Sequence, residues 1–302
     1  MDIAVSAESF GYRLADVFAE RRYEGNGVAV FVDPPRLSQS QLMRVTTEVR
    51  QFESAYLWPT PDPTTFETRI FVVDRELEFA GHPVLGAAAV LHERHGAAVH
   101  EQQWTLRLGT RAVSVRTLPD ERGGYDVSME QGTPAFGPVM DDHYRSRVAQ
   151  ALSLEADDLV PELPVQWVST GLRYLIVPVR PDALTRARIG TAIFGELLAE
   201  AGALLCYVLD PENREGRNWV NDGSVEDIAT GSASGPAASY LARYRLADMN
   251  KTIELAQGRF LNRPSIMRVD LAGEADRIDG VRLSGHVCLT GTGTMDGPPA
   301  LR

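Results

Sequence analysis

GHPVLGAAAVL, at residues 81–91, and GSASGPAASYL, at residues 231–241, are the two stretches of sequence that decide the fold. Aligned at an offset of 150 residues, they share a glycine, two alanines and a leucine among eleven positions. Residues 83–93 are apolar nearly all round, and a helix with that pattern is normally buried on every side. The first stretch therefore predicts a helix enclosed by other elements, and the second predicts its counterpart.

A second pair of segments repeats at almost the same distance. VFVDPPRLS (residues 30–38) aligns with VPVRPDALT (residues 177–185) at an offset of 147 residues, and each has the pattern of a strand, a proline turn and a helix start. Similar offsets for two different elements favour a duplicated domain. We expect an α+β fold with two pseudo-symmetric domains, each a β-sheet wrapped round a central apolar helix, and an active site in the cleft between the domains.

The remaining patterns predict further elements and a domain boundary. A helix is expected at residues 38–49, with Ser38 as its N-cap. The Gly- and Pro-rich segment QGTPAFGPVM (residues 131–140) marks the boundary. We expect an N-terminal domain of residues 1–130, completed by a C-terminal strand at about residues 285–295, and a C-terminal domain of residues 131–284. Alternating apolar patterns predict strands at residues 28–33, 54–58, 68–74, 104–108, 112–118 and 125–129.

Composition limits the partners and the chemistry. The 302 residues include 30 basic and 41 acidic side chains, and the net charge of −11 argues against a nucleic-acid or anionic-membrane partner. No apolar run reaches the roughly 18–20 residues of a membrane span, and no secretory signal is visible, so we expect a cytoplasmic protein. Lys251 is the single lysine and has no phosphate-binding glycine loop near it, so Schiff-base chemistry with pyridoxal is not expected.

Cysteines and histidines give no sign of a metal or thiol site. Cys206 and Cys288 lie in apolar, strand-like runs and are expected to be core residues. His92, His95 and His100 are close in sequence, but they lack a carboxylate or cysteine partner at metal-ligand spacing. We therefore predict no metal, and no motif indicates a cofactor.

Three titratable residues are candidates for acid–base chemistry. Glu53, beside Phe52 and an apolar strand, is either an ordinary surface residue or a desolvated carboxyl group whose pKa is raised from about 4.3. His82 stands at a helix start, where the helix dipole disfavours the imidazolium, and it is either a cap residue or a neutral hydrogen-bond donor. Asp227 precedes a Thr-Gly-Ser turn, where it either supports helix capping or belongs to a site.

The two helix starts, Gly81-His82 and Gly231-Ser232, are candidate anion sites. The first N–H groups of a helix have no partner within the helix, and they favour a negative group at that end. A pair of such starts would suit a small substrate with a carboxylate.

Five segments resemble a known family, the PhzF family of phenazine-biosynthesis isomerases, in order and spacing along nearly the whole chain. These segments are VFAERRYEGNGVAVF (17–31), FESAYL (52–57), ELEFAGHPVLGAAAVL (76–91), VEDIATGSASGPAASYLARY (225–244) and QGRFLNRPS (257–265). The resemblance implies the fold of diaminopimelate epimerase, a homodimer and a mechanism without a cofactor.

The resemblance also implies roles for six residues. Glu53 would remove a proton from a substrate carbon and return it at another position of a conjugated system. His82 and Asp227 would orient the substrate and relay or stabilise charge. Ser232, with the backbone N–H groups at Gly81 and Gly231, would hold the substrate carboxylate. The related epimerases carry a cysteine at each of these helix starts, and this sequence has none there.

Four positions depart from the commonest pattern of the family, and they are Gly27, Phe52, Ile228 and Asn262. We expect an isomerase that shifts a proton and a double bond in a small cyclic amino or imino acid of secondary metabolism, antibiotic or phenazine-like. Its substrate would be trans-2,3-dihydro-3-hydroxyanthranilate or a pyrroline carboxylate of an alkylproline pathway. The alternatives are a non-catalytic protein that binds a metabolite or a partner, and a racemase or epimerase.

Overall fold

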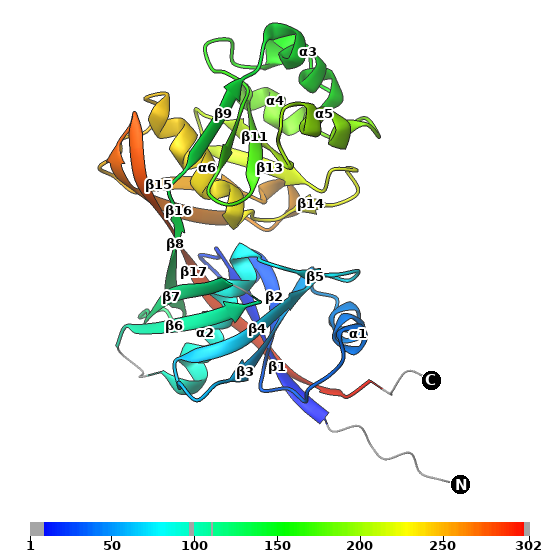
Figure 1. Ribbon diagram of the computed structural model, residues 1–302, viewed down its shortest axis with the longest axis vertical. Coiled ribbons are helices and arrows are strands. Elements are labelled where there is room, and N and C mark those ends of the chain that lie inside the picture. The colour runs from blue at the N-terminus through cyan, green and yellow to red at the C-terminus, as the bar shows by residue number, and fades with distance from the viewer. Residues whose placement is uncertain (1–8, 97–99, 110, 299–302) are drawn as a thin grey trace. The chain divides into compact units, whose positions relative to one another are not determined.

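The computed structural model describes residues 9–96, 100–109 and 111–298. The chain divides into two compact units (Figure 1). The N-terminal unit is Met1–Met129 with Gly285–Arg302, and the C-terminal unit is Glu130–Ser284. The end of the chain returns to the N-terminal unit through the long strand β17 (Arg277–Asp296).

A ring of paired strands forms the N-terminal unit. The pairing runs from β17 through β1, β2, β3, β4, β6 and β7 to β8, and β8 pairs with β17 again, so the sheet is barrel-like. The bounds are β1 (Ser9–Val17), β2 (Asn26–Val32), β3 (Glu53–Pro59), β4 (Thr65–Phe71), β6 (Gln102–Leu108), β7 (Arg111–Pro119) and β8 (Tyr125–Gly132).

Helix α2 (Gly81–His95) is buried from Gly81 to His92 and contacts β1, β2, β3, β6 and β7. Small side chains allow this enclosure. A Cβ atom at Gly86 would lie 2.6 Å from Val28 Cγ1, so any larger residue there would push β2 away. The apolar pattern of residues 83–93 is thus explained by a helix without an exposed face in its first three turns.

Helix α1 (Gln39–Val49) has the N-cap predicted for it. Ser38 accepts a hydrogen bond from the backbone N–H of Gln41, and the Gln41 side chain reciprocates as a capping box. Its buried residues pack on an aromatic cluster in which Phe31 stacks on Tyr56 with ring centroids 4.7 Å apart.

The strand predicted at residues 68–74 is wrong in its bounds, because β4 ends at Phe71. The Val72 N–H donates to Arg75 O at 3.0 Å and closes a turn, after which the two-residue strand β5 (Glu76–Leu77) pairs back on β4. The apolar Val72 and Val73 continue the strand pattern into this turn, so the sequence pattern does not show that the chain reverses direction after Phe71.

In the C-terminal unit the paired strands are ordered β9, β10, β11, β12, β13, β15, β16 and the first part of β17. Its strands are β9 (Ala135–Val139), β10 (Gln166–Ser169), β11 (Arg173–Pro178), β12 (Leu205–Asp210), β13 (Glu215–Trp219), β15 (Ile253–Gln257) and β16 (Ser265–Glu274), and the short β14 (Glu226–Asp227) pairs with β13. Helix α6 (Gly231–Arg243) is buried along most of its length and contacts β10, β11, β12, β15 and β16.

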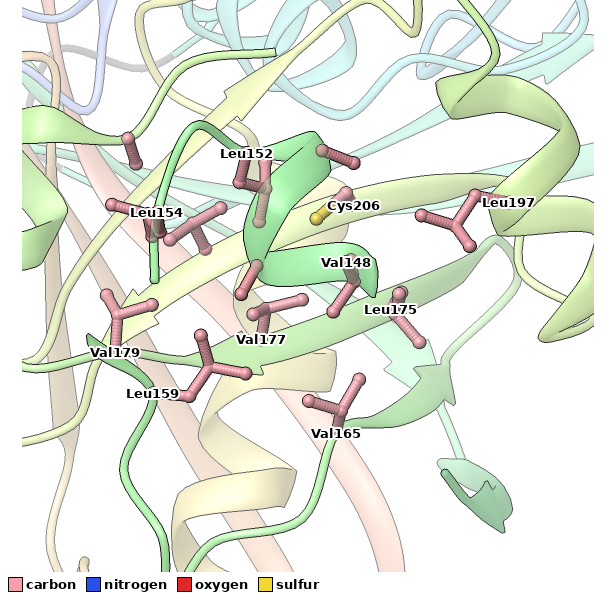
Figure 2. Packing of buried hydrophobic residues seen from close by; sticks show 14 of the residues in the cluster. Val148, Leu152, Leu154, Leu159, Val165, Leu175, Val177, Val179, Leu197 and Cys206 are labelled. Atoms are coloured by element: carbon pink, nitrogen blue, oxygen red, sulfur yellow. The ribbon is translucent and has the colours of Figure 1, made fainter. Parts of the chain in front are cut away.

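Three further helices share a hydrophobic cluster with side chains of β11 and β12. They are α3 (Asp142–Ala151), α4 (Pro181–Arg186) and α5 (Phe194–Glu200). Figure 2 shows Val148 of α3 against Leu175 and Val177 of β11, with Cys206 in the same cluster. The two units together confirm the predicted α+β class, rich in sheet.

Both cysteines are buried, as the sequence predicts. Burial raises the pKa of the Cys206 thiol, and it raises the pKa of Cys288 to about 11. Neither thiol is therefore a ready thiolate near neutral pH.

No helix in the described part of the chain is both long enough and apolar enough to cross a membrane.

Candidate active site

Glu53 and His82 meet inside the N-terminal unit. Glu53 begins β3, opposite Val28 of the parallel strand β2, and His82 is the second residue of α2. His82 Nε2 lies 3.7 Å from Glu53 Oε2, and the two residues are only 5% and 7% exposed. The interpretation of Glu53 as an ordinary surface residue is therefore wrong.

Phe52 does not bury Glu53 as the sequence suggests. Its own side chain is exposed, at 39%, because it lies just before β3. The Glu53 carboxylate is shielded instead by its place at the start of a strand whose next residues are fully enclosed, with the imidazole of His82 beside it.

Asn26 contacts the imidazole ring of His82 on the Nδ1 side. The Asn26 amide Nδ2 lies 3.4 Å from His82 Nδ1, and an amide nitrogen can only donate. This contact is compatible with the neutral tautomer in which Nδ1 accepts and Nε2, the nitrogen that faces Glu53, carries the proton. Sequence reasoning missed this role of Asn26.

The turn before Asn26 requires glycine. Gly25 has φ +69°, and a Cβ atom there would lie 2.4 Å from Val17 O. The Gly-Asn pair at residues 25–26 was visible in the sequence, but its pattern alone does not tell which side chain the asparagine meets.

Asp227 and Thr230 form a short hydrogen bond in the C-terminal unit. Asp227 ends β14, and its Oδ2 accepts from the Thr230 hydroxyl at 2.7 Å. Thr230 occupies the N-cap position of α6, yet in the described chain its hydroxyl makes no cap hydrogen bond to the helix. Thr230 is thus the N-cap residue of α6 by position, but its hydroxyl donates to Asp227 and does not cap the helix.

Ser232 is paired with a tyrosine that the sequence analysis did not single out. The Tyr174 hydroxyl of β11 lies 2.6 Å from Ser232 Oγ, and Tyr174 is 1% exposed. A phenol is the more acidic partner, so in this pair we expect Tyr174 to donate. The Ser232 proton can then be directed to another acceptor.

The same kind of ion pair anchors the short strand before each of these helices. Arg69 binds Glu76 through two hydrogen bonds and lies 5.0 Å from the ring of Phe71. Arg217 binds Glu226 through two hydrogen bonds and lies 4.6 Å from the ring of Trp219. Bidentate pairs of this type fix geometry as well as charge. Both follow an Arg-x-aromatic pattern, which a search of the sequence could have found.

Two of the three histidines considered for metal binding, His92 and His95, have other partners. His92 is buried, and its Nδ1 lies 2.6 Å from the Thr117 hydroxyl, while the ring of His95 packs on Phe66 with centroids 5.8 Å apart. Within residues 9–96, 100–109 and 111–298, no group of three or more histidine, cysteine or acidic side chains is arranged to hold a metal ion.

Comparison with known proteins identifies the family of the chain. The family model "Phenazine biosynthesis-like protein" (PhzC-PhzF) matches residues 15–293. The trans-2,3-dihydro-3-hydroxyanthranilate isomerase of Pseudomonas aeruginosa is 32% identical over 290 residues, covering 91% of this chain and 95% of that protein.

Two solved structures share the fold. A predicted epimerase from Pseudomonas aeruginosa matches with a TM-score of 0.88 at 45% identity, covering 95% of this chain and 99% of that chain. A PhzF family protein from Bacillus anthracis matches with a TM-score of 0.79 at 22% identity over the same shares of the two chains. The resemblance seen in the sequence is confirmed, as is the predicted enzyme class, isomerase.

Proposed function

The chain belongs to the PhzC-PhzF family, and we propose that it is a cofactor-independent isomerase that shifts a proton and a double bond in a small cyclic amino or imino carboxylic acid. The observation that carries this proposal is the buried pair of Glu53 and His82, 3.7 Å apart, with Asn26 in contact with the imidazole. Proton abstraction from carbon requires a base and a group that stabilises the developing negative charge, and a buried carboxylate beside a hydrogen-bond donor supplies both.

In the proposed reaction Glu53 is the base. Its carboxylate takes a proton from a substrate carbon, the electron pair of that C–H bond enters the conjugated system, and the double bond moves. The proton on Glu53 exchanges with solvent, and Glu53 then delivers a proton to another carbon of that system, so the carboxylate of Glu53 is regenerated. His82, with its proton on Nε2, stabilises the negative charge that develops in between. A positioned acid–base group of this kind is usually worth about 10²–10⁴-fold in rate.

The other four predicted residues hold the substrate in this proposal. The N–H groups at Gly81 and Gly231 and the hydroxyl of Ser232 bind the carboxylate, because helix starts favour anions. Asp227 accepts a hydrogen bond from the substrate amine or hydroxyl. The finer fold features, pseudo-symmetric domains with central helices, are part of the same proposal, as are a homodimer and a cytoplasmic location.

The name of a relative supports a choice of substrate. We favour trans-2,3-dihydro-3-hydroxyanthranilate, the acid in the name of the Pseudomonas aeruginosa relative, and keep a pyrroline carboxylate as the second choice. Either acid belongs to antibiotic or phenazine-like secondary metabolism.

Isotope exchange tests the proposal. Incubation of the protein with each acid in D₂O, followed by mass spectrometry and NMR, should place deuterium on a product carbon with a shifted double bond. Glu53→Gln, which keeps the size of the side chain and removes the base, should lower the rate at least about 100-fold. Turnover at the parental rate by this variant would refute Glu53 as the base.

An epimerase is the second candidate, because the structure with 45% identity is described as a predicted epimerase. The same experiment separates the two reactions. An epimerase would introduce deuterium at the original stereocentre and leave the double bonds in place. The buried thiols of Cys206 and Cys288 do not favour the two-cysteine version of that chemistry.

A further inference from the structure

The buried amide of Gln257 lies directly behind the turn that carries Asp227. Gln257 ends β15 and is 1% exposed. Its Nε2 donates to Asp227 O at 2.8 Å and to Thr230 Oγ1 at 3.0 Å, while its Oε1 accepts from the Thr230 N–H at 3.2 Å. One amide therefore holds both ends of the turn from residue 227 to residue 230.

These contacts determine the direction of every hydrogen bond. A backbone carbonyl can only accept and a backbone N–H can only donate, so the orientation of the Gln257 amide is fixed by two backbone groups. Thr230 Oγ1 then accepts from Gln257, and its single proton points to Asp227 Oδ2, 2.7 Å away. The chain of donors runs from Gln257 through Thr230 to the carboxylate of Asp227.

Gly258 permits this approach. A Cβ atom there would lie 2.6 Å from Ile228 O and 2.3 Å from Arg263 O, and its φ is +85°. A side chain at this position would force the end of β15 away from the Asp227 turn. The Gln-Gly pair thus works as one unit, in which the glycine allows close contact and the glutamine makes the hydrogen bonds.

We propose that Gln257 and Thr230 are positioning residues that hold the Asp227 carboxylate in one rotamer as an acceptor for the substrate. This inference rests on the proposed function, because it assigns Asp227 a place at the substrate. Asp227 is partly accessible, whereas Thr230 and Gln257 are buried. The hydrogen bond that holds the carboxylate therefore comes from the interior of the protein. Preorganisation of this kind lowers the cost of orienting a group during the reaction.

The test uses three variants of the full-length protein. Thr230→Val has nearly the same shape but lacks the hydroxyl, and we expect its kcat to fall about tenfold with KM changed less than about threefold. Thr230→Ser restores the hydroxyl and should return kcat to within about threefold of the parent. Gln257→Met removes all the amide contacts and should lower kcat at least as much as Thr230→Val.

Two results would overturn the inference. One is a Thr230→Val enzyme with parental kcat and KM, and the other is a Thr230→Ser enzyme as impaired as Thr230→Val, since a purely steric role would not be rescued by the hydroxyl. A crystal structure of Thr230→Val supplies a readout without turnover, because Asp227 should adopt a different or mixed rotamer. If the parent turns over neither acid, the proposed function fails, and the Asp227 rotamer alone decides the inference.

Discussion

The starts of helices α2 and α6 share the same arrangement of backbone and ion pair, but they carry different functional side chains. Each follows a two-residue strand anchored by an arginine–glutamate pair, and each presents a glycine and then a polar residue. At α2 that residue is His82, between Asn26 and Glu53. At α6 it is Ser232, hydrogen-bonded to Tyr174, with Asp227 held by Thr230. In the proposed function the first start carries out proton transfer, and the second start binds the substrate through Ser232 and orients it through Asp227.

Substituting the second residue of each helix tests this division with the largest expected effect. His82→Gln keeps a polar side chain but removes the imidazole, and we expect kcat to fall about 100-fold. Ser232→Ala removes one hydrogen bond to a charged group, worth about 1.5–3 kcal/mol, and should raise KM about tenfold or more with little change in kcat. Steady-state kinetics on the acid that shows deuterium exchange would measure both, and a reversed pattern would contradict the assignment.

A smaller effect is expected from the residues that orient these two side chains. Asn26→Asp has the same size, but its carboxylate accepts from His82 Nδ1 and moves the proton away from the nitrogen that faces Glu53. We expect kcat to fall about tenfold, and ¹⁵N NMR of the His82 ring should show Nδ1 changing from acceptor to protonated nitrogen. An unchanged spectrum would contradict the tautomer proposed for His82.

Tyr174→Phe is the matched control in the other unit. It removes only the hydroxyl that contacts Ser232 Oγ at 2.6 Å. The expected result is a rise in KM of about threefold and an unchanged kcat, because a single neutral hydrogen bond contributes about 1 kcal/mol.

The smallest effect is expected at the cysteines, since neither helix start depends on a thiol. Burial raises the pKa of Cys288 to about 11, so the thiol remains protonated at pH 8 and becomes a thiolate only as the pH approaches 11. Cys288→Ser should keep kcat within about twofold, and a thiol reagent should modify the native protein slowly at pH 8 and faster as the pH rises. Loss of activity in this variant at full folding would instead support a cysteine mechanism.

Local patterns in the sequence predict much of the fold. The apolar runs of residues 83–91 and 233–241 correctly indicate helices that are buried nearly all round, and Ser38 correctly marks a helix start. The reversal after Phe71 was missed because Val72 and Val73 look like strand residues. A turn of that kind is decided by the pairing of β5, which is not encoded in the local pattern.

The candidate site was predicted less completely. The burial of Glu53 follows from strand neighbours that are far away in the sequence. The prediction that Phe52 shields Glu53 was wrong, because Phe52 is exposed. Asn26, Tyr174 and Gln257 contact site residues 56, 58 and 30 positions away. Contacts over such separations depend on tertiary packing, so no local pattern in the sequence predicts them.

The anchoring pairs Arg69–Glu76 and Arg217–Glu226 have a consequence for how this scaffold can change. They secure the approach to each helix from the strand side, outside the turns that carry His82 and Asp227. New substrate preferences could therefore be selected by changing residues in the turns while the two arginine–glutamate pairs stay unchanged. Directed evolution that randomises residues 78–80 and residue 228, and spares the site residues and the four anchors, should retain a high fraction of folded proteins.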